Sequence, residues 1–159
     1  MALDVYSENI RALSKVLNRG AVDDKVQDEV KKIKSELERE ELYSKFVDAT
    51  MNQEMSKAYN IFKRLKQNGH LKSDDRTKRL EEILKSISEV EDKFYETASR
   101  QDNLMIEIEK RKRMGEDERV KELENELSSV KSEMVFKKRA LDRAAKKLEL
   151  VRELFEEVK

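Results

Sequence analysis

The last third of the chain carries the pattern that most restricts the fold. Between residues 118 and 159, apolar side chains recur at alternating spacings of three and four residues, and only Lys137 interrupts the series. This spacing places them on one face of a helix, and a period of 3.5 residues keeps that face aimed at a partner helix. The members of this seam are Val120, Leu123, Leu127, Val130, Met134, Leu141, Ala144, Leu148, Val151, Phe155 and Val158.

Composition favours long helices with a narrow buried stripe. Charged residues make up 44% of the 159 residues and apolar residues 37%. The chain has no proline and three glycines, so little interrupts a helix. Disorder is the competing interpretation of such high charge, but the apolar residues are periodic and the formal net charge is zero.

Upstream of the seam, the same periodicity predicts the helices that would pack against it. Residues 1–20 are expected to form a short amphipathic helix that ends near Gly20, a residue that adopts a left-handed conformation at no steric cost. Residues 21–159 are expected to form three long helices, at about 22–67, 74–113 and 117–158. The breaks fall at Asn68-Gly69-His70 and at Met114-Gly115, and Ser73, Asp74 and Asp75 provide the N-cap region of the middle helix.

Short connections between helices favour antiparallel neighbours. Folding the chain about Gly69 and Gly115 places Met51 beside Val90, and Val90 beside Leu141, while Phe46 lies beside the stripe of its helix. We therefore predict an all-α fold, an elongated antiparallel three-helix coiled-coil bundle with a short extra N-terminal amphipathic helix.

The residues that most catalytic sites require are absent or isolated. His70 is the only histidine, cysteine is absent, and no two glycines share a phosphate-binding motif. Paired acids such as Glu40 and Glu41 are numerous, as expected for solvated faces of a highly charged chain. We therefore expect no enzyme activity, no cofactor and no metal site. With no signal-peptide core and no long apolar run, a cytoplasmic protein is the default expectation.

Four features are candidates for interaction. The N-terminal helix has an apolar stripe of Tyr6, Ile10, Leu13 and Leu17. A basic tip surrounds the first connection and includes Lys63, Arg64, Lys66, Arg76 and Arg79, although the acidic residues near residue 157 should lie at the same end. A basic stretch on the last helix directs Arg139, Arg143 and Lys146 outward, while Phe136 belongs to a side stripe expected to be mostly covered. Finally, Lys137 is expected to set register, with Asp92 or Asp48 as its partner.

A short amphipathic helix followed by three long helices resembles the general plan of BAR-type membrane-curving dimers. That resemblance of plan implies a peripheral membrane-surface module. The residues themselves favour a non-enzymatic coiled-coil scaffold or adaptor that mediates protein–protein interaction as a homodimer. The alternatives are the membrane-surface module, with an anionic membrane as partner, and a nucleic-acid-binding helical bundle that uses both basic stretches.

Overall fold

The computed structural model describes residues 2–18 and 24–159 and, for residues 2–6 and 16–18, the backbone alone. Within those residues the secondary structure is entirely helical. The helices are α1 (Ala2–Asn18), α2 (Asp24–Met51), α3 (Met55–Gln67), α4 (Asp75–Arg113), α5 (Asp117–Lys146) and α6 (Leu148–Val158). The all-α prediction is therefore confirmed.

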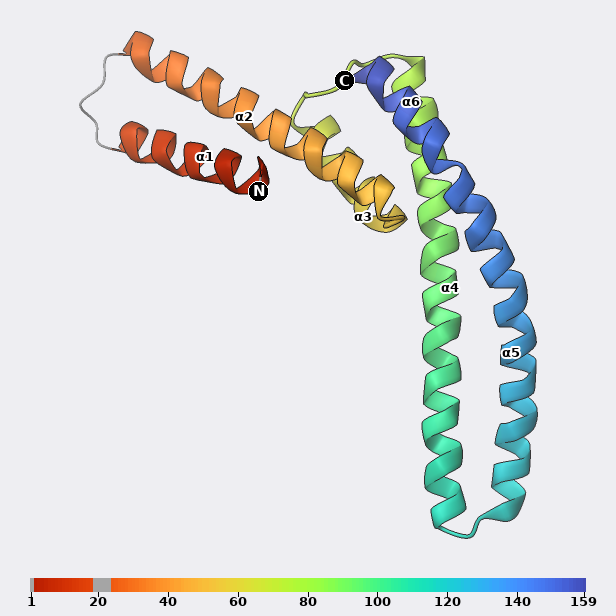
Figure 1. The fold of residues 1–159 in the computed structure, drawn as a ribbon. Helices are drawn as coiled ribbons and strands as arrows, with labels where there is room; N and C mark the ends of the chain where they lie inside the picture. The colour runs from red at the N-terminus through yellow and green to blue at the C-terminus, as the bar shows by residue number, and fades with distance from the viewer. Residues whose placement is uncertain (1, 19–23) are drawn as a thin grey trace.

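The longest part of the molecule is an antiparallel hairpin of α4 and α5 (Figure 1). Its 39-residue first arm is about 60 Å long at 1.5 Å per residue. The chain reverses at Gly115, whose φ of 73° is the left-handed conformation that glycine adopts without strain. Asp74 caps α4 by accepting hydrogen bonds from the amides of Arg76 and Thr77, and α4 spans Asp75–Arg113 where the sequence predicted a helix over about 74–113.

The main hydrophobic core lies at the end of the hairpin away from Gly115. There the second half of α2, α3, the first half of α4, and α6 pack together. Phe46 is fully buried at its centre, with its ring centroid 4.2 Å from that of Phe155 and 6.3 Å from that of Phe62. We call this region the head, and residues 95–136 of the hairpin the stalk. The stalk has its own smaller cluster around Ile108, Val120 and Leu123.

The single helix predicted over residues 22–67 is wrong, because the chain reverses between Met51 and Met55 and forms two helices. Gln53, at the reversal, has a φ of 57°, which is uncommon for a residue other than glycine. Folding back allows Phe46 to pack against Phe62 and Phe155, and leaves Met51 with 63% of its surface exposed.

The reversal also changes the predicted three-helix arrangement. In the head, α3 and α6 pack along α4, and α2 packs on α3 and α6. The described helices therefore form a two-helix stalk joined to a multi-helix head, where the sequence predicted three long helices side by side. Val90 and Leu141, which the sequence predicted to pair, are both partly buried against the head core.

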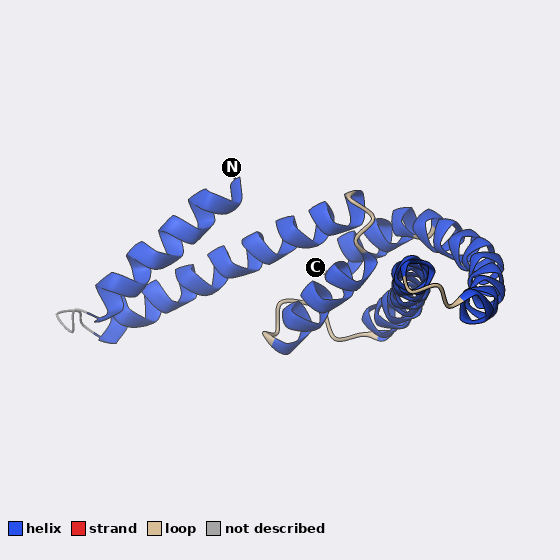
Figure 2. Ribbon diagram, turned by 90° about the horizontal axis from the view of Figure 1, so that it is seen from below, coloured by secondary structure: helices blue, strands red, loops and turns tan. Residues whose placement is uncertain are grey.

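The N-terminal helix α1 packs against α2, and together they form an arm that extends from the head (Figures 1 and 2). The hydroxyl of Ser7 donates a hydrogen bond to the carboxylate of Glu41 across this contact, at 3.2 Å. At the other end of the chain, the amide of Lys72 donates to the carbonyl of Val158 at 2.7 Å. That bond brings α6 to the connection between α3 and α4.

Candidate functional site

The outer side of α5 presents an exposed aromatic ring beside three cations. Phe136 is 67% exposed and Val135 51% exposed, and both project from a helix whose seam faces α4. We call the following residues the α5 patch: Val135, Phe136, Arg139, Arg143 and Lys146. A hollow of about 510 Å³ is lined by the last four of them and by Asp142.

Helical spacing explains why these side chains gather. Residues 136, 139, 143 and 146 are separated by three or four positions, so they share one face of α5. Val130, Leu141 and Ala144 form the opposite face and pack toward α4 or the head. The patch therefore points away from the protein's own core.

The electrostatics of the α5 patch are strongly positive. The guanidinium of Arg139 lies 5.9 Å from the centre of the Phe136 ring, within range of a cation–π interaction. The carboxylate of Asp142 is 3.3 Å from the ammonium group of Lys138, which neutralises the one acid in the hollow. Across the part of the chain that the structure describes, no ion pair involves Arg139, Arg143 or Lys146.

The predicted basic tip is partly neutralised within the chain. Lys66 forms an ion pair with Glu81 at 2.5 Å, and Arg76 forms one with Asp74 at 3.0 Å. The hydrogen bond from Arg76 holds the pKa of the Asp74 carboxyl below its usual value. The ammonium group of Lys63 lies 4.6 Å from the Tyr59 ring. The acidic end of α6 lies at this connection, as predicted, because Lys72 also donates to the carbonyl of Glu157.

Two other tip candidates, Arg64 and Arg79, are exposed on α3 and α4 respectively. The tip therefore combines paired and exposed cations, and it lacks the exposed aromatic ring that distinguishes the α5 patch.

The structure describes two of the four side chains in the apolar stripe of the N-terminal helix. Ile10 and Leu13 are half-buried, as expected from the packing of α1 on α2. Tyr6 and Leu17 lie in α1, but their side chains fall outside the described residues. The packing of α1 on α2 gives Ile10 and Leu13 a structural role.

Lys137 lies half-buried in the seam, but its partner differs from the one predicted. Its ammonium group is 3.6 Å from the carboxylate of Glu133, one turn earlier on α5. Asp92 accepts a hydrogen bond from Ser56, at 2.7 Å, and Asp48 lies on α2, which turns away from the stalk. The predicted pairing with Asp92 or Asp48 is therefore wrong.

Sequence reasoning did not find the full α5 patch because it expected Phe136 to be covered by a third helix. The reversal of α2 removes that cover from the stalk. A signal was available in the sequence, since Phe136 precedes Arg139 and Arg143 at spacings of three and seven and so shares their face. The same reversal leaves Tyr95 and Ile106 of α4 exposed.

Comparison with known proteins gives no relative from which a role could be inferred. No protein-family model, no curated protein and no solved structure matches the chain. Each described helix is too short or too polar to cross a bilayer.

Proposed function

We propose that this protein is a non-enzymatic helical scaffold that mediates protein–protein interaction and assembles as a homodimer. The observation that supports this most directly is the α5 patch, in which an exposed Phe136 lies among three cations without acidic partners in the described chain. Aromatic and arginine side chains provide much of the binding energy of protein interfaces. A rigid helix also presents them at little entropic cost.

The chemistry of the patch favours an acidic protein segment with an apolar side chain as its partner. The apolar side chain would pack on Phe136, while carboxylates would pair with Arg139, Arg143 and Lys146. A single aromatic ring is a poor platform for successive nucleic-acid bases, which stack on several rings. The packing of the N-terminal helix on α2 supports a role for this helix within the chain in preference to one on a lipid surface.

The test compares proteins captured from an extract of the native cells by three immobilised baits. These are the unchanged protein, a Phe136→Ala/Arg143→Glu variant, and a Lys121→Glu control that alters an exposed charge of α5 outside the patch. Quantitative mass spectrometry should show proteins retained by the first and third baits and lost by the second. Equal recovery on all three baits would contradict the proposal.

Parallel assays address the other two partner classes. Vesicles of phosphatidylserine and phosphatidylcholine, and a duplex DNA, are each mixed with the same three proteins. Under the proposal neither binds in a way that depends on the α5 patch. Patch-dependent sedimentation with the vesicles would instead favour the membrane-surface module, and patch-dependent DNA binding with a steep salt dependence would favour the nucleic-acid-binding bundle.

A further inference from the structure

One face of α4 is covered in the head and uncovered in the stalk. In the head, Ser88 and Glu91 on this face form hydrogen bonds with Ser56 and Met55 of α3. The cover ends there, because α3 begins at Met55. At spacings of three or four residues the same face continues through Tyr95, Ser99, Asp102, Ile106, Glu109 and Arg113.

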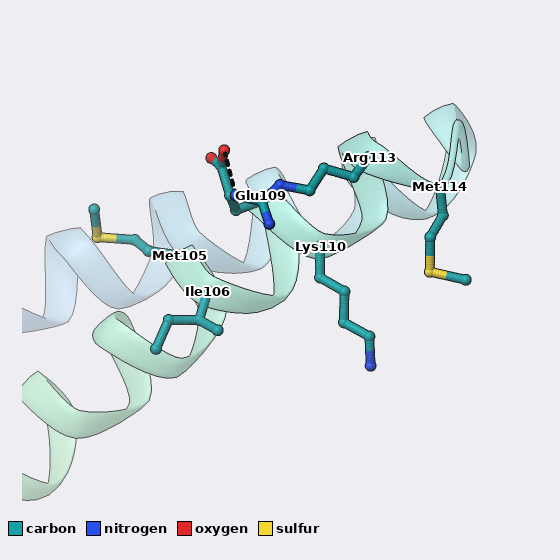
Figure 3. Close-up of a pocket in the computed structure, with 6 residues that line it drawn as sticks. All are labelled: Met105, Ile106, Glu109, Lys110, Arg113 and Met114. Atoms are coloured by element: carbon teal, nitrogen blue, oxygen red, sulfur yellow. Dashed lines mark ion pairs between the residues drawn. The ribbon is translucent and has the colours of Figure 1, made fainter.

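The uncovered part of this face is apolar at two places. Tyr95 is 60% exposed and Ile106 68% exposed, far more than a helix stripe facing its own core. A hollow of about 720 Å³ lies beside Tyr95, and another of about 620 Å³ lies beside Ile106. Figure 3 shows Ile106, Lys110 and Met114 projecting from α4 to the same side. The face thus offers two separated apolar contacts along one straight helix.

Charge changes sign along the same face. Asp92 and Glu96 line the hollow beside Tyr95, where the one cation, Arg100, lies 3.4 Å from Glu133 of α5. Lys110 and Arg113 line the hollow beside Ile106 together with one acid, Glu109, whose carboxylate lies 3.8 Å from the guanidinium of Arg113, so this end keeps a net positive charge through Lys110. The acidic end of one such face is therefore complementary to the basic end of another when the two helices run in opposite directions.

We propose that a second copy of this chain packs antiparallel on this face of α4, about a two-fold axis that passes near Asp102. With the axis midway between Tyr95 and Lys110, Tyr95 of each copy lies opposite Lys110 of the other. The same axis places Asp92 opposite Arg113. Such a contact uses one surface twice, as a two-fold interface must. This inference rests on the proposed homodimer and assigns it a surface distinct from the α5 patch.

The charge arrangement supplies a reciprocal test. Glu96 and Lys110 belong to no ion pair among the described residues, so reversing either charge removes no ion pair seen within the chain. Position 96 of one copy lies next to position 110 of the other, so each single reversal brings two like charges together at this contact. Sedimentation velocity over a concentration series should therefore show a dimer dissociation constant at least about tenfold higher for Glu96→Lys and for Lys110→Glu. The double variant should regain most of the affinity. Glu126→Lys, an exposed charge of α5, serves as the control.

Cross-linking then fixes the orientation. The chain has no cysteine, so introduced cysteines can be paired without interference. A mixture of Glu96→Cys and Lys110→Cys proteins should cross-link with a short bismaleimide. Glu96→Cys alone should not, because the two positions 96 of an antiparallel dimer about this axis are about 20 Å apart along the helix. Cross-linking of Glu96→Cys alone would show a parallel pair and overturn the proposal.

The outcomes separate this inference from the proposed function. If neither charge reversal changes the dimer dissociation constant, the dimer uses another surface. That result overturns this inference and leaves the homodimer in place. A chain that stays monomeric at every concentration would overturn both the inference and the homodimer. Capture by the α5 patch is measured independently, and the α4 variants should leave it unchanged.

Discussion

The carboxylate of Glu91, on α4, accepts hydrogen bonds from the backbone amides of Met55 and Ser56 at 2.8 and 3.2 Å. These amides belong to the first turn of α3, and the local N-cap residue, Glu54, makes no side-chain cap bond. Glu91 thus caps a helix 36 residues away in the sequence. This contact stabilises the point at which the chain reverses between α2 and α3.

Replacing Glu91 with alanine should therefore destabilise the head. Loss of a helix cap costs about 1–2 kcal/mol, and here two amide donors lose their partner at once. The free energy of unfolding, from urea denaturation followed by circular dichroism, measures the effect. Glu89→Ala alters an exposed acid of the same helix and should have little effect. Equal stability of the two variants would show that the cap contributes nothing.

The reversal at residues 52–54 makes opposite predictions for two neighbouring apolar residues. Phe46→Ala should cost about 3–5 kcal/mol, because it empties the centre of the head core. Met51→Ala should change stability by less than about 0.5 kcal/mol, because Met51 is exposed. A continuous helix over residues 22–67 predicts the reverse order, with Met51 in the stripe and Phe46 beside it. Urea denaturation of the two variants decides between these arrangements.

The sequence predicted the α4–α5 hairpin from two local signals, although the single helix expected over residues 117–158 is divided at Lys147 into α5 and α6. Three-four periodicity defines the seam, and Gly115 marks the turn. The N-terminal limit of α4 follows from Asp74, a cap that acts within its own helix. Such features need no knowledge of distant contacts.

The head could not be predicted in the same way, because its determinants are long-range. No proline or glycine marks the reversal near Gln53, and the apolar stripe of the helix predicted over residues 22–67 continues on both sides of it. What decides the reversal is the cap from Glu91 and the fit of Phe46 between Phe62 and Phe155. The exposure of Phe136, and with it the α5 patch, follows from that reversal and was missed for the same reason.

The stability of the head should depend on pH through His70, the only histidine. Burial, with a further contribution from Arg39, holds the pKa of its imidazole below the usual 6.5. The unfolded chain therefore binds a proton near pH 6.5 that the folded chain does not, and stability falls as pH decreases through that value.

Thermal melting between pH 7.5 and 5.5 tests this dependence. The melting temperature should decline slightly over the interval, and the decline should disappear in His70→Asn. The carbonyl of His70 accepts a hydrogen bond from the hydroxyl of Tyr43, at 2.5 Å. This hydrogen bond should survive the substitution because its acceptor is a backbone atom. An unchanged pH profile in the variant would assign the dependence to other groups.

Lys137 provides a test of how a charged residue in the seam affects stability, register and oligomeric state. It occupies a seam position between Met134 and Leu141, with its side chain 29% exposed, and pairs with Glu133 on the same helix. Partly exposed ion pairs contribute less than about 1 kcal/mol, and Glu133 retains a second partner in Arg100. Lys137→Leu should therefore gain roughly 1 kcal/mol from apolar burial and raise the melting temperature.

The same substitution should loosen the uniqueness of assembly, because a charged residue in a helical seam disfavours alternative registers and oligomers. Light scattering of Lys137→Leu should then show a mixture of oligomers where the unchanged protein shows one. Lys131→Leu adds an apolar residue at an exposed position of α5 and controls for non-specific association caused by added apolar surface. If Lys137→Leu instead melts well below the unchanged protein, the ammonium group is a required partner of Glu133 and does not act by excluding other registers.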